Sequence, residues 1–553
     1  MNKFRTYFTI LLLGLISYPP VIAQQAGEEH FESSKQLDIF NALFKELSMF
    51  YVDTINPQTS VRNAIDSMLS KLDPYTVYYS EDEMADFKFL TTGEYGGIGA
   101  VISQRNEKII VSDPYEGMPA TLAGLMAGDE ILEIDGQRVA GKTPAQVSEK
   151  LKGQPNTVVR VKFQRLGEKK PQTVDITRKR IQLEPVKYYG VVQDSIGYIY
   201  LSNFTEQSAS AVKAAFDDLK KNHHIKSLIL DLRDNPGGLM NDAVQLVNMF
   251  VPKGVLVVST KGKMKQWDRT YRTIQEPVDR EIPLAVLVNR GSASSAEIVA
   301  GALQDLDRAV VVGSRTFGKG LVQSSREMPF NGSLKITVSK YYIPSGRCIQ
   351  AIDYSHRNAD GSVAAVPDSL TSVFFTSNGR EVKDGGGITP DYVIEGKKTP
   401  SIIYYLISEY ILFDFATEYR HTHSQIAPVA DFLITDDDYQ LFKTFVKTKN
   451  FDYDRQSGKA MEILKEAMEF EAYMNVASAE FTALEEKLKP DLDRDLDLYK
   501  DIISEYLAQE IVKRYYYQEG EIIETLKNDA DLEKAIEILS DKALYRETLK
   551  FDD

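Results

Sequence analysis

The chain has 553 residues, of which 43% are apolar, enough for several domains with buried cores. Its formal net charge of −15 argues against nucleic-acid binding, because that function needs a basic surface. The charge is concentrated in residues 401–553, which contain 18 Lys and Arg against 34 Asp and Glu. We interpret this acidic block as the solvated surface of a helical region.

Residues 1–23 have the pattern of a secretory signal. Two basic residues precede an apolar core, Tyr7–Ile16, and Val21–Ala23 fits a cleavage site. We therefore expect export, with the periplasm as the destination. An uncleaved signal would instead anchor the chain in the membrane. After cleavage we expect no integral membrane protein, because no later apolar run is long enough to span a bilayer.

The rest of the chain divides by its hydrophobic pattern. Residues 24–90 are expected to be helical, and residues 91–180 to form short strands. Residues 181–400 alternate strand and helix patterns, which is typical of α/β layers. Strands are expected at 196–201, 227–232, 255–259, 282–288, 309–312 and 333–339, and helices at 208–220, 239–250 and 295–306.

Residues 401–553 are expected to be helical. An apolar stripe that includes Ile503, Leu507 and Ile511 predicts a helix that ends at Gly520. Stripes of this kind imply a buried face, so we expect a folded domain. We favour an accessory domain that can be separated from the preceding region near residue 400. The domain is also a candidate for self-association or for binding an adaptor.

Ser294 lies where a buried strand is expected to turn into a helix. Backbone N–H groups at a helix N-terminus favour developing negative charge, which suits a nucleophilic serine. The alternative is that Ser292, Ser294 or Ser295 only caps the helix, as serines often do. No Gly-x-Ser-x-Gly sequence surrounds Ser294, so the usual hydrolase elbow is absent.

Lys319 follows Ser294 by twenty-five positions and can act as its base. None of the six histidines lies in either segment. A lysine in water titrates near about 10.4, and burial would favour the neutral amine that a base requires. The alternative is a phosphate loop, since Gly313–Lys319 fits G-x-x-x-x-G-K. Against it, Gly320 replaces the expected Ser or Thr, and a strand pattern follows instead of a helix.

Several segments, taken together and in order, resemble the carboxyl-terminal processing peptidases, also called tail-specific proteases. The match spans roughly residues 35–395. The segments are Leu72-Asp-Pro-Tyr75, Gly93-Glu-Tyr-Gly-Gly-Ile-Gly99, the PDZ-like stretch Gly117–Gly136, Leu230-Asp-Leu-Arg-Asp-Asn-Pro-Gly-Gly238, Gly291-Ser-Ala-Ser294, Phe317-Gly-Lys-Gly-Leu-Val-Gln323 and Asp384-Gly-Gly-Gly-Ile-Thr-Pro390.

The resemblance implies a role for each residue of a serine–lysine site. Ser294 is the expected nucleophile, Lys319 the general base and Gln323 the group that orients the lysine. The family's serine run is often Ser-Ala-Ser-Ala-Ser-Glu, whereas this chain has Ser292-Ala-Ser-Ser-Ala-Glu297. Ser294 keeps its place relative to Gly291, Glu297 and Lys319, so it is preferred over Ser295.

The resemblance also implies the groups around the dyad. The amides of Gly237 or Gly238, together with that of Ser295, are expected to form the oxyanion hole. Asp231, Arg233 and Glu297 are expected to be a charged scaffold rather than reacting groups. In the PDZ-like part, the loop Gly96, Gly97, Ile98 and Gly99 is expected to hold a substrate's terminal carboxylate, with a helix capped by Thr143 beside the groove.

The predicted fold is an α/β peptidase core of layered strand–helix units, at 181–400, with an inserted PDZ-like domain at 91–180. A helical segment at 24–90 precedes it, and an all-α extension at 401–553 follows. The predicted function is an exported serine endopeptidase that recognises the C-terminal tails of unfolded or tail-exposed proteins. No cofactor and no metal are expected. The alternative is a non-catalytic PDZ-type adaptor on the same fold.

Overall fold

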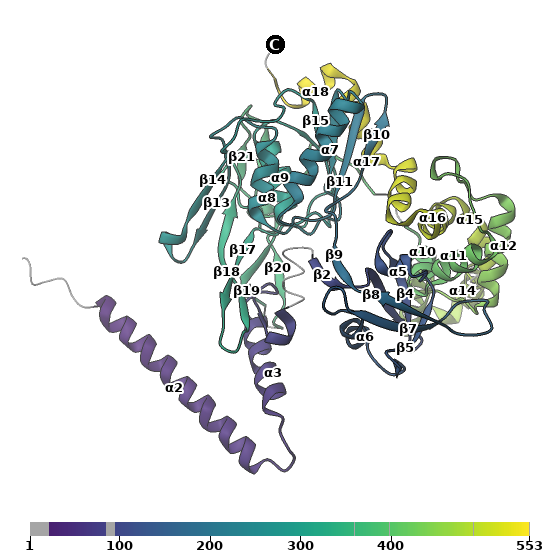
Figure 1. The fold of residues 1–553 in the computed structure, drawn as a ribbon, viewed down its shortest axis with the longest axis horizontal. Helices are drawn as coiled ribbons and strands as arrows, with labels where there is room; N and C mark the ends of the chain where they lie inside the picture. Colours follow the sequence, from purple (N-terminus) through teal and green to yellow (C-terminus); the bar gives the residue numbers. More distant parts are fainter. Residues whose placement is uncertain (1–20, 85–93, 359, 397–398, 490, 552–553) are drawn as a thin grey trace, which may run out of the picture. The chain divides into compact units, whose positions relative to one another are not determined.

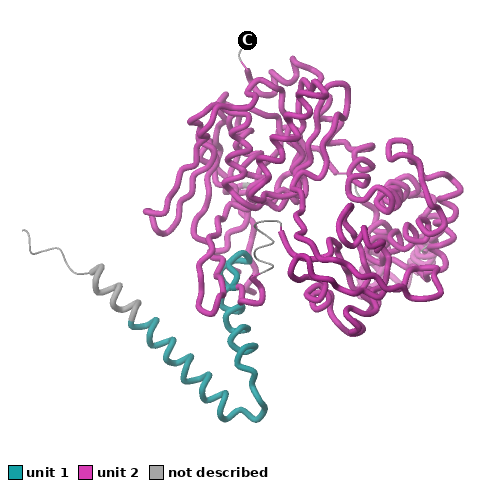
Figure 2. Tube along the Cα trace, in the orientation of Figure 1, with its two compact units in different colours: residues 1–78 teal, residues 79–553 magenta. Residues whose placement is uncertain are grey.

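The computed structural model describes residues 21–84, 94–358, 360–396, 399–489 and 491–551. Most of the predicted signal therefore lies outside the described residues, as does Gly93 of the PDZ-like motif. The chain separates into two units, residues 1–78 and 79–553 (Figure 2). Within the described residues, no helix combines the length and apolar character that crossing a membrane requires.

The first unit is mainly helical where it is described. It contains α2 (Val21–Phe50) and α3 (Pro57–Ser70). The start of α3 is specified locally, because Pro57 occupies the first turn and the Asn56 side chain accepts a hydrogen bond from the Thr59 amide.

The centre of the second unit is a largely parallel sheet in the order β10-β11-β12-β15-β16-β23 (Figure 1). Its strands are β10 (Val186–Gln193), β11 (Ile196–Leu201), β12 (Ser227–Asp231), β15 (Leu284–Val288), β16 (Val310–Gly313) and β23 (Tyr392–Val393). Only the β10–β11 pair among these strands is antiparallel. One face packs against α7 (Ser208–Asn222), α8 (Met240–Asn248) and α9 (Ser295–Asp305) in one apolar cluster. The predicted α/β layers are confirmed.

A second sheet adjoins this core. It contains β13 (Leu256–Gly262), β14 (Arg269–Arg272), β17 (Leu321–Glu327) and β18 (Ser333–Tyr342), with antiparallel pairs β13–β14, β13–β18 and β17–β18. Short hairpins follow, β19 (Ile352–Arg357) with β20 (Val363–Ala365) and β21 (Val373–Phe375) with β22 (Glu381–Lys383). The predictions missed β17, whose residues are mostly polar and partly exposed.

The PDZ-like part is an antiparallel sheet closed by a helix. The order is β3 (Ala100–Arg105), β4 (Lys108–Pro114), β5 (Glu130–Ile134), β7 (Val158–Gln164) and β8 (Gln172–Thr177), with β6 (Gln137–Arg138) beside β5. A short helix, α5 (Pro119–Leu122), follows β4, while β2 (Glu94–Gly97) pairs with β9 (Lys179–Gln182). Helix α6 (Pro144–Leu151) begins as predicted, with Thr143 and Gln146 forming a reciprocal capping box.

The C-terminal region is helical, as predicted. Its elements are α10 (Ser401–Ser408), α11 (Ile411–Thr422), α12 (Asp436–Thr448), α13 (Gln456–Phe470), α14 (Met474–Lys487), α15 (Leu492–Leu498), α16 (Lys500–Thr525), α17 (Ala530–Ser540) and α18 (Lys542–Thr548). The predicted end at Gly520 is wrong: α16 continues to Thr525, with a break at Tyr517 (φ 53°). Gly520 lies within this helix, at a position where an added Cβ would be only 2.4 Å from Tyr516 Cβ, so the packing there requires a glycine.

The last two helices do not join the helical core. Leu532, Ala535, Ile538, Tyr545 and Leu549 pack instead on the second face of the central sheet, against Ile196, Tyr198, Ile229, Ala285, Leu287, Val310 and Val312. In Figure 1 these helices, drawn in yellow, lie beside β15. The expectation that everything beyond about residue 400 forms one separable domain is therefore wrong for α17 and α18. Both faces of the sheet are covered, as a parallel sheet requires.

Candidate active site

Ser294 occupies the turn between β15 and α9, at the N-cap of the helix. Its backbone has φ 56° and ψ −114°, a conformation that a residue with a side chain seldom adopts. Two neighbours hold it there. The Tyr341 hydroxyl donates to the Ser294 carbonyl at 3.2 Å, and the Ser294 amide donates to Glu297 Oε2 at 2.8 Å. The strained turn is thus fixed from both sides.

The neighbouring serines have different contacts. Ser292 Oγ donates to the Leu232 carbonyl at 2.7 Å and accepts from the Asn289 amide at 2.9 Å. Ser295 Oγ donates to the Gly238 carbonyl at 2.9 Å. Both hydroxyls therefore join residues 289–295, here called the serine turn, to the loop that follows β12.

Glu297 links the two predicted catalytic segments. It is fully buried, and its carboxylate accepts hydrogen bonds from Thr316 Oγ1 (2.6 Å) and from the amides of Gly318 (2.7 Å), Lys319 (2.9 Å) and Ser294 (2.8 Å). Burial raises the pKa of Glu297 even though these donors lower it. One carboxylate therefore fixes the backbone at Ser294 and at Lys319 together.

Lys319 lies on a well-anchored loop and is half-buried. On either side of it, the Gly320 amide donates to Gln350 Oε1 at 2.7 Å, and the Gly318 carbonyl accepts from the Ala351 amide at 2.8 Å. Strand β17 begins at Leu321, directly after this loop. A phosphate loop would open a helix at this point, so the alternative interpretation of Gly313–Lys319 is not supported.

Gln323 lies on β17. Its amide nitrogen donates to Thr337 Oγ1 on β18 at 3.1 Å. The predicted orientation of Lys319 by Gln323 stays a prediction.

The loop after β12, residues 233–238, is here called the glycine loop. Its Gly237 amide donates to Asn235 Oδ1 at 2.9 Å, and the Ala293 amide donates to the Asn235 carbonyl at 2.9 Å. Within the described part of the chain, neither the Gly238 amide nor the Ser295 amide donates a hydrogen bond. Two glycine amides were candidates for an oxyanion hole. The Gly238 amide is the better candidate, because the Gly237 amide already donates to Asn235 Oδ1.

Gly237 packs directly against the serine turn. Its φ is 92°, and a Cβ added there would lie 2.7 Å from both Ser294 Cβ and the Ala293 carbonyl. We expect Gly237→Ala to lower stability by about 1–3 kcal/mol and cleavage at least about a hundredfold, because it strains the loop and displaces Ser294. Peptide cleavage and thermal unfolding measure the two effects.

Gly254 provides a matched control for that substitution. Its φ is 87°, but an added Cβ meets nothing within 4 Å. Gly254→Ala should therefore cost about 1 kcal/mol of stability and leave cleavage unchanged. Equal loss of activity in both variants would mean that backbone strain alone, and not the contact with Ser294, impairs the site.

Asp231 and Arg233, the other two residues expected to act as a scaffold, lie at the end of β12 and at the start of the glycine loop. Asp231 is buried and accepts a hydrogen bond from the Tyr198 hydroxyl at 2.7 Å. The Arg233 guanidinium donates to Asp231 and also to Asp529 and Asp531 of the C-terminal segment. Asp231 and Arg233 were predicted to belong to a charged scaffold, but nothing in the sequence indicated that they pair with each other or that Arg233 has partners near α17.

Asn235 and Tyr341 are site residues that the sequence analysis missed. Asn235 is buried, and its amide nitrogen also donates to the Leu201 carbonyl at 2.8 Å. The Asn-Pro-Gly-Gly sequence could have revealed it, because an Asn side chain often accepts from the backbone two residues later. Tyr341 gave no such signal, since an aromatic residue in a strand usually indicates packing.

The PDZ-like part contains a groove of about 330 Å³ between β3 and α6. Its lining comprises Tyr95, Ile98, Ala100, Val101, Ile102, Tyr115, Pro144, Ala145, Ser148, Leu151 and Lys152. Of the predicted loop, Gly96 and Gly97 instead belong to β2 and pair with β9, while Ile98 and Gly99 connect β2 to β3. Ile98 contributes to the groove. Within the described residues β3 is an edge strand, and Ala100, Val101 and Ile102 of this strand line the groove. Burial raises the pKa of Tyr95 to about 12, although a hydrogen bond with the Gly99 backbone lowers it.

Family models match three parts of the chain. "Peptidase family S41" matches residues 195–356, "PDZ domain" matches residues 110–165, and "Probable PDZ-protease, C-terminal helical domain" matches residues 402–539.

Known proteins are similar to more than half of the chain. The "Carboxy-terminal-processing protease" of Bartonella bacilliformis is 38% identical over 336 residues, covering 60% of this chain and 77% of that protein. A "Probable CtpA-like serine protease" of Staphylococcus aureus is 34% identical, covering 62% and 70%. Among solved structures, "Photosystem II D1 C-terminal processing protease" is 27% identical and covers 64% of this chain and 86% of its own, with a TM-score of 0.36.

The peptidase family model covers the segments that meet at Glu297, and the PDZ model lies within the PDZ-like part. The chain is therefore a member of the carboxy-terminal processing proteases, serine-type peptidases of family S41 that carry a PDZ domain.

Proposed function

We propose that the protein is an endopeptidase with a serine–lysine dyad, in which Ser294 is the nucleophile and Lys319 the general base. Gln323 is the group proposed to orient Lys319. The observation that supports this most directly is the buried carboxylate of Glu297, which accepts from the amides of both dyad residues. A site whose two halves are fixed by one carboxylate is preorganised for proton transfer between them.

The proposed reaction has two steps. Ser294 Oγ attacks the carbonyl carbon of the scissile bond, and its proton moves to the neutral amine of Lys319. The amides of Gly238 and Ser295 stabilise the oxyanion, each by an amount comparable to the roughly 3–4 kcal/mol measured for single donors elsewhere. Lys319 then protonates the leaving amine and leaves an acyl-enzyme. Water, deprotonated by the same lysine, attacks this ester; the bond from the acyl carbon to Ser294 Oγ breaks, Lys319 returns the proton to Oγ, and the second product leaves.

The PDZ-like groove is proposed to select substrates by their C-terminal tails. An extended tail can add to the free edge of β3, while the amides of Gly96–Gly99 bind its carboxylate. Lys152 lines the groove, with its ammonium 5.9 Å from the centroid of the Tyr95 ring, and its positive charge favours a carboxylate nearby. Apolar lining residues such as Ile98 and Leu151 favour an apolar last residue.

A comparison of a free tail with an amidated tail tests this proposal. Peptides that differ only in a C-terminal carboxylate or amide should differ by about tenfold or more in KM, with little change in kcat, because a charged hydrogen-bond acceptor is lost. Lys152→Ala should reduce that difference. Lys150→Ala is the matched control, since Lys150 Nζ donates to Gln137 Oε1 outside the groove lining. Equal KM values for both peptides would refute tail recognition.

Export to the periplasm is proposed from residues 1–23. The proposed domains are residues 24–90, 91–180, 181–400 and 401–553, with the qualification that α17 and α18 pack on the peptidase sheet. Self-association or adaptor binding is proposed for the C-terminal helical region, residues 401–553. The competing function, a non-catalytic PDZ-type adaptor, predicts tail binding without cleavage.

A further inference from the structure

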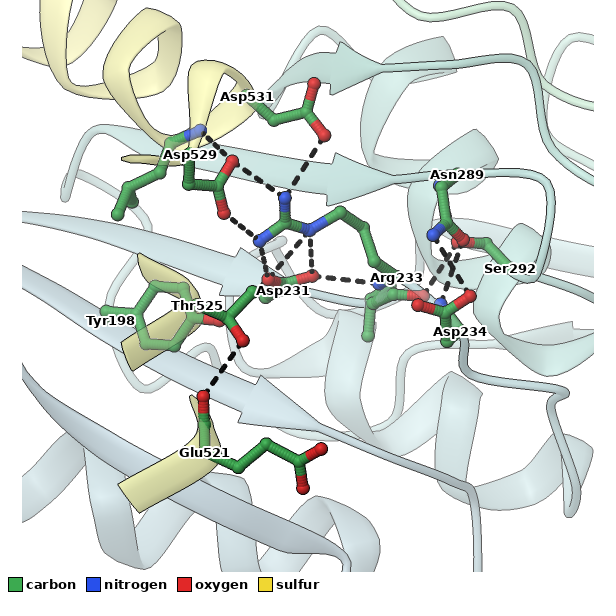
Figure 3. Close-up of polar contacts among 12 residues, drawn as sticks. Tyr198, Asp231, Arg233, Asp234, Asn289, Ser292, Glu521, Thr525, Asp529 and Asp531 are labelled. Atoms are coloured by element: carbon green, nitrogen blue, oxygen red, sulfur yellow. Dashed lines mark hydrogen bonds and ion pairs between the residues drawn. The ribbon is translucent and has the colours of Figure 1, made fainter. Parts of the chain in front are cut away.

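Arg233 is held by carboxylates from two distant parts of the chain (Figure 3). Its Nη2 lies 2.6 Å from Oδ2 of Asp231, the last residue of β12, and its Nε lies 3.1 Å from Asp231 Oδ1. From the C-terminal segment, Asp529 accepts from Nη1 at 2.9 Å and from Nη2 at 2.6 Å. Asp531 accepts from Nη1 at 3.1 Å. The guanidinium therefore makes bidentate contacts with Asp231 and with Asp529.

This cluster is well shielded from water. The side chains of Arg233, Asp231 and Asp529 are 16%, 2% and 6% exposed. Burial alone would lower the pKa of Arg233, but the charge of Asp231 and the hydrogen bonds to Asp529 leave that pKa well above its ordinary value. A planar guanidinium fixed on several sides in this way has little freedom to move.

Arg233 is also the first residue of the glycine loop, which contacts the serine turn at several points. The Asp234 amide donates to Asn289 Oδ1 at 2.9 Å, and the Ala293 amide donates to the Asn235 carbonyl at 2.9 Å. The Gly238 carbonyl accepts from Ser295 Oγ at 2.9 Å. A displacement of Arg233 would therefore be transmitted to the amide of Gly238 and to the turn that carries Ser294.

The C-terminal carboxylates are placed by a helix that packs on the sheet. Asp529 is the N-cap of α17 and accepts from the Leu532 amide at 3.0 Å. Leu532, Ala535 and Ile538 of α17 pack against the face of the sheet that carries Tyr198 and Ile229. The apolar contacts set where α17 lies, and its first turn then presents two carboxylates to Arg233.

We propose that Asp529 and Asp531 are positioning residues for the peptidase site, acting through Arg233 on the glycine loop. The proposal rests on the proposed function in one respect, the use of the Gly238 amide as an oxyanion donor. It assigns to the extreme C-terminal segment, which lies some 300 residues beyond the loop in sequence, a part in aligning the catalytic groups.

The test compares full-length variants that change charge and little else. Asp529→Asn, Asp531→Asn and the double variant remove the carboxylates, while Asn at position 529 still caps the helix. Asp541→Asn is the matched control, because Asp541 caps α18 through the amides of Ala543 and Leu544. Each variant is assayed for kcat and KM on one peptide, for thermal unfolding, and for hydrogen exchange of residues 232–239.

We expect the double variant to lose about tenfold or more in kcat, with KM within about twofold of wild type, because misalignment near the reacting groups lowers turnover. Exchange of residues 232–239 should become faster, whereas Asp541→Asn should alter neither property. Asp531→Glu should restore most of the kcat that Asp531→Asn loses.

Wild-type kcat and unchanged exchange in the double variant would overturn the proposal. A loss of kcat that Asp541→Asn shares would do so as well, since it would indicate a general effect of the C-terminal helices. Failure of the proposed function is distinguishable: cleavage by Ser294→Ala would reject the dyad, while exchange of residues 232–239 would still decide whether Asp529 and Asp531 hold the loop.

Discussion

Replacement of Ser294 or Lys319 by Ala is expected to abolish peptide cleavage, with a loss of at least about 10⁴-fold in kcat for each single variant. The size of the effect follows from the dyad, because a nucleophile and its base act as one unit and removal of either disables both. Removing both should cost little more than removing one. Initial rates on a fluorogenic peptide measure the loss, and circular dichroism checks that both variants remain folded.

Ser295→Ala is the matched control for that experiment. The change leaves the Ser295 amide in place and removes only the hydroxyl that donates to the Gly238 carbonyl. We therefore expect a moderate reduction, within about tenfold, since a single hydrogen bond contributes roughly 0.5–1.5 kcal/mol. Ser294 would be rejected as the nucleophile if Ser294→Ala cleaved at a near-wild-type rate. The same conclusion would follow if Ser294→Ala stayed active while Ser295→Ala lost all cleavage.

The layers of the fold could be predicted because their signals are local. Strand β15 is a continuous apolar run, β12 has an apolar centre at Leu228–Leu230, and Thr143 before Pro144 marks the start of α6. The Ser294 turn and the Lys319 loop could also be located, because each follows such a strand. Their connection through Glu297 was less accessible, since a glutamate three residues after a serine predicts a helix cap and nothing more.

Long-range packing explains what the sequence did not reveal. Whether α17 packs on the helical core or on the sheet depends on which apolar surface is left uncovered by the rest of the fold, and no local pattern encodes that. The acidic composition of residues 401–553 suggested a solvated surface, yet the buried Asp529 and the partly buried Asp531 both pair with Arg233. A charge run identifies neither the few members that are buried nor their partners.

A chain that ends at Thr525 is expected to fail to fold to a soluble, active protein. Removal of α17 and α18 would uncover the sheet residues Tyr198, Ile229 and Leu287, which are now fully or almost fully buried. Fully burying one large apolar side chain contributes about 1.5–3 kcal/mol. The loss of several such contacts is comparable to the whole stability of a typical domain, about 5–15 kcal/mol. The exposed face would also favour aggregation.

A deletion of similar size elsewhere in the helical region controls for chain length. Within α13 and α14, Phe481 is the single described residue that is buried. Replacing residues 456–487 by a short Gly-Ser linker should therefore leave a soluble enzyme with near-wild-type cleavage. Soluble yield, thermal unfolding and reaction of Ser294 with a serine-directed probe compare the two deletions. A soluble, cooperative and reactive chain ending at Thr525 would show that the peptidase sheet does not need its C-terminal cover, and the earlier expectation of a separable region would then hold for α17 and α18 too.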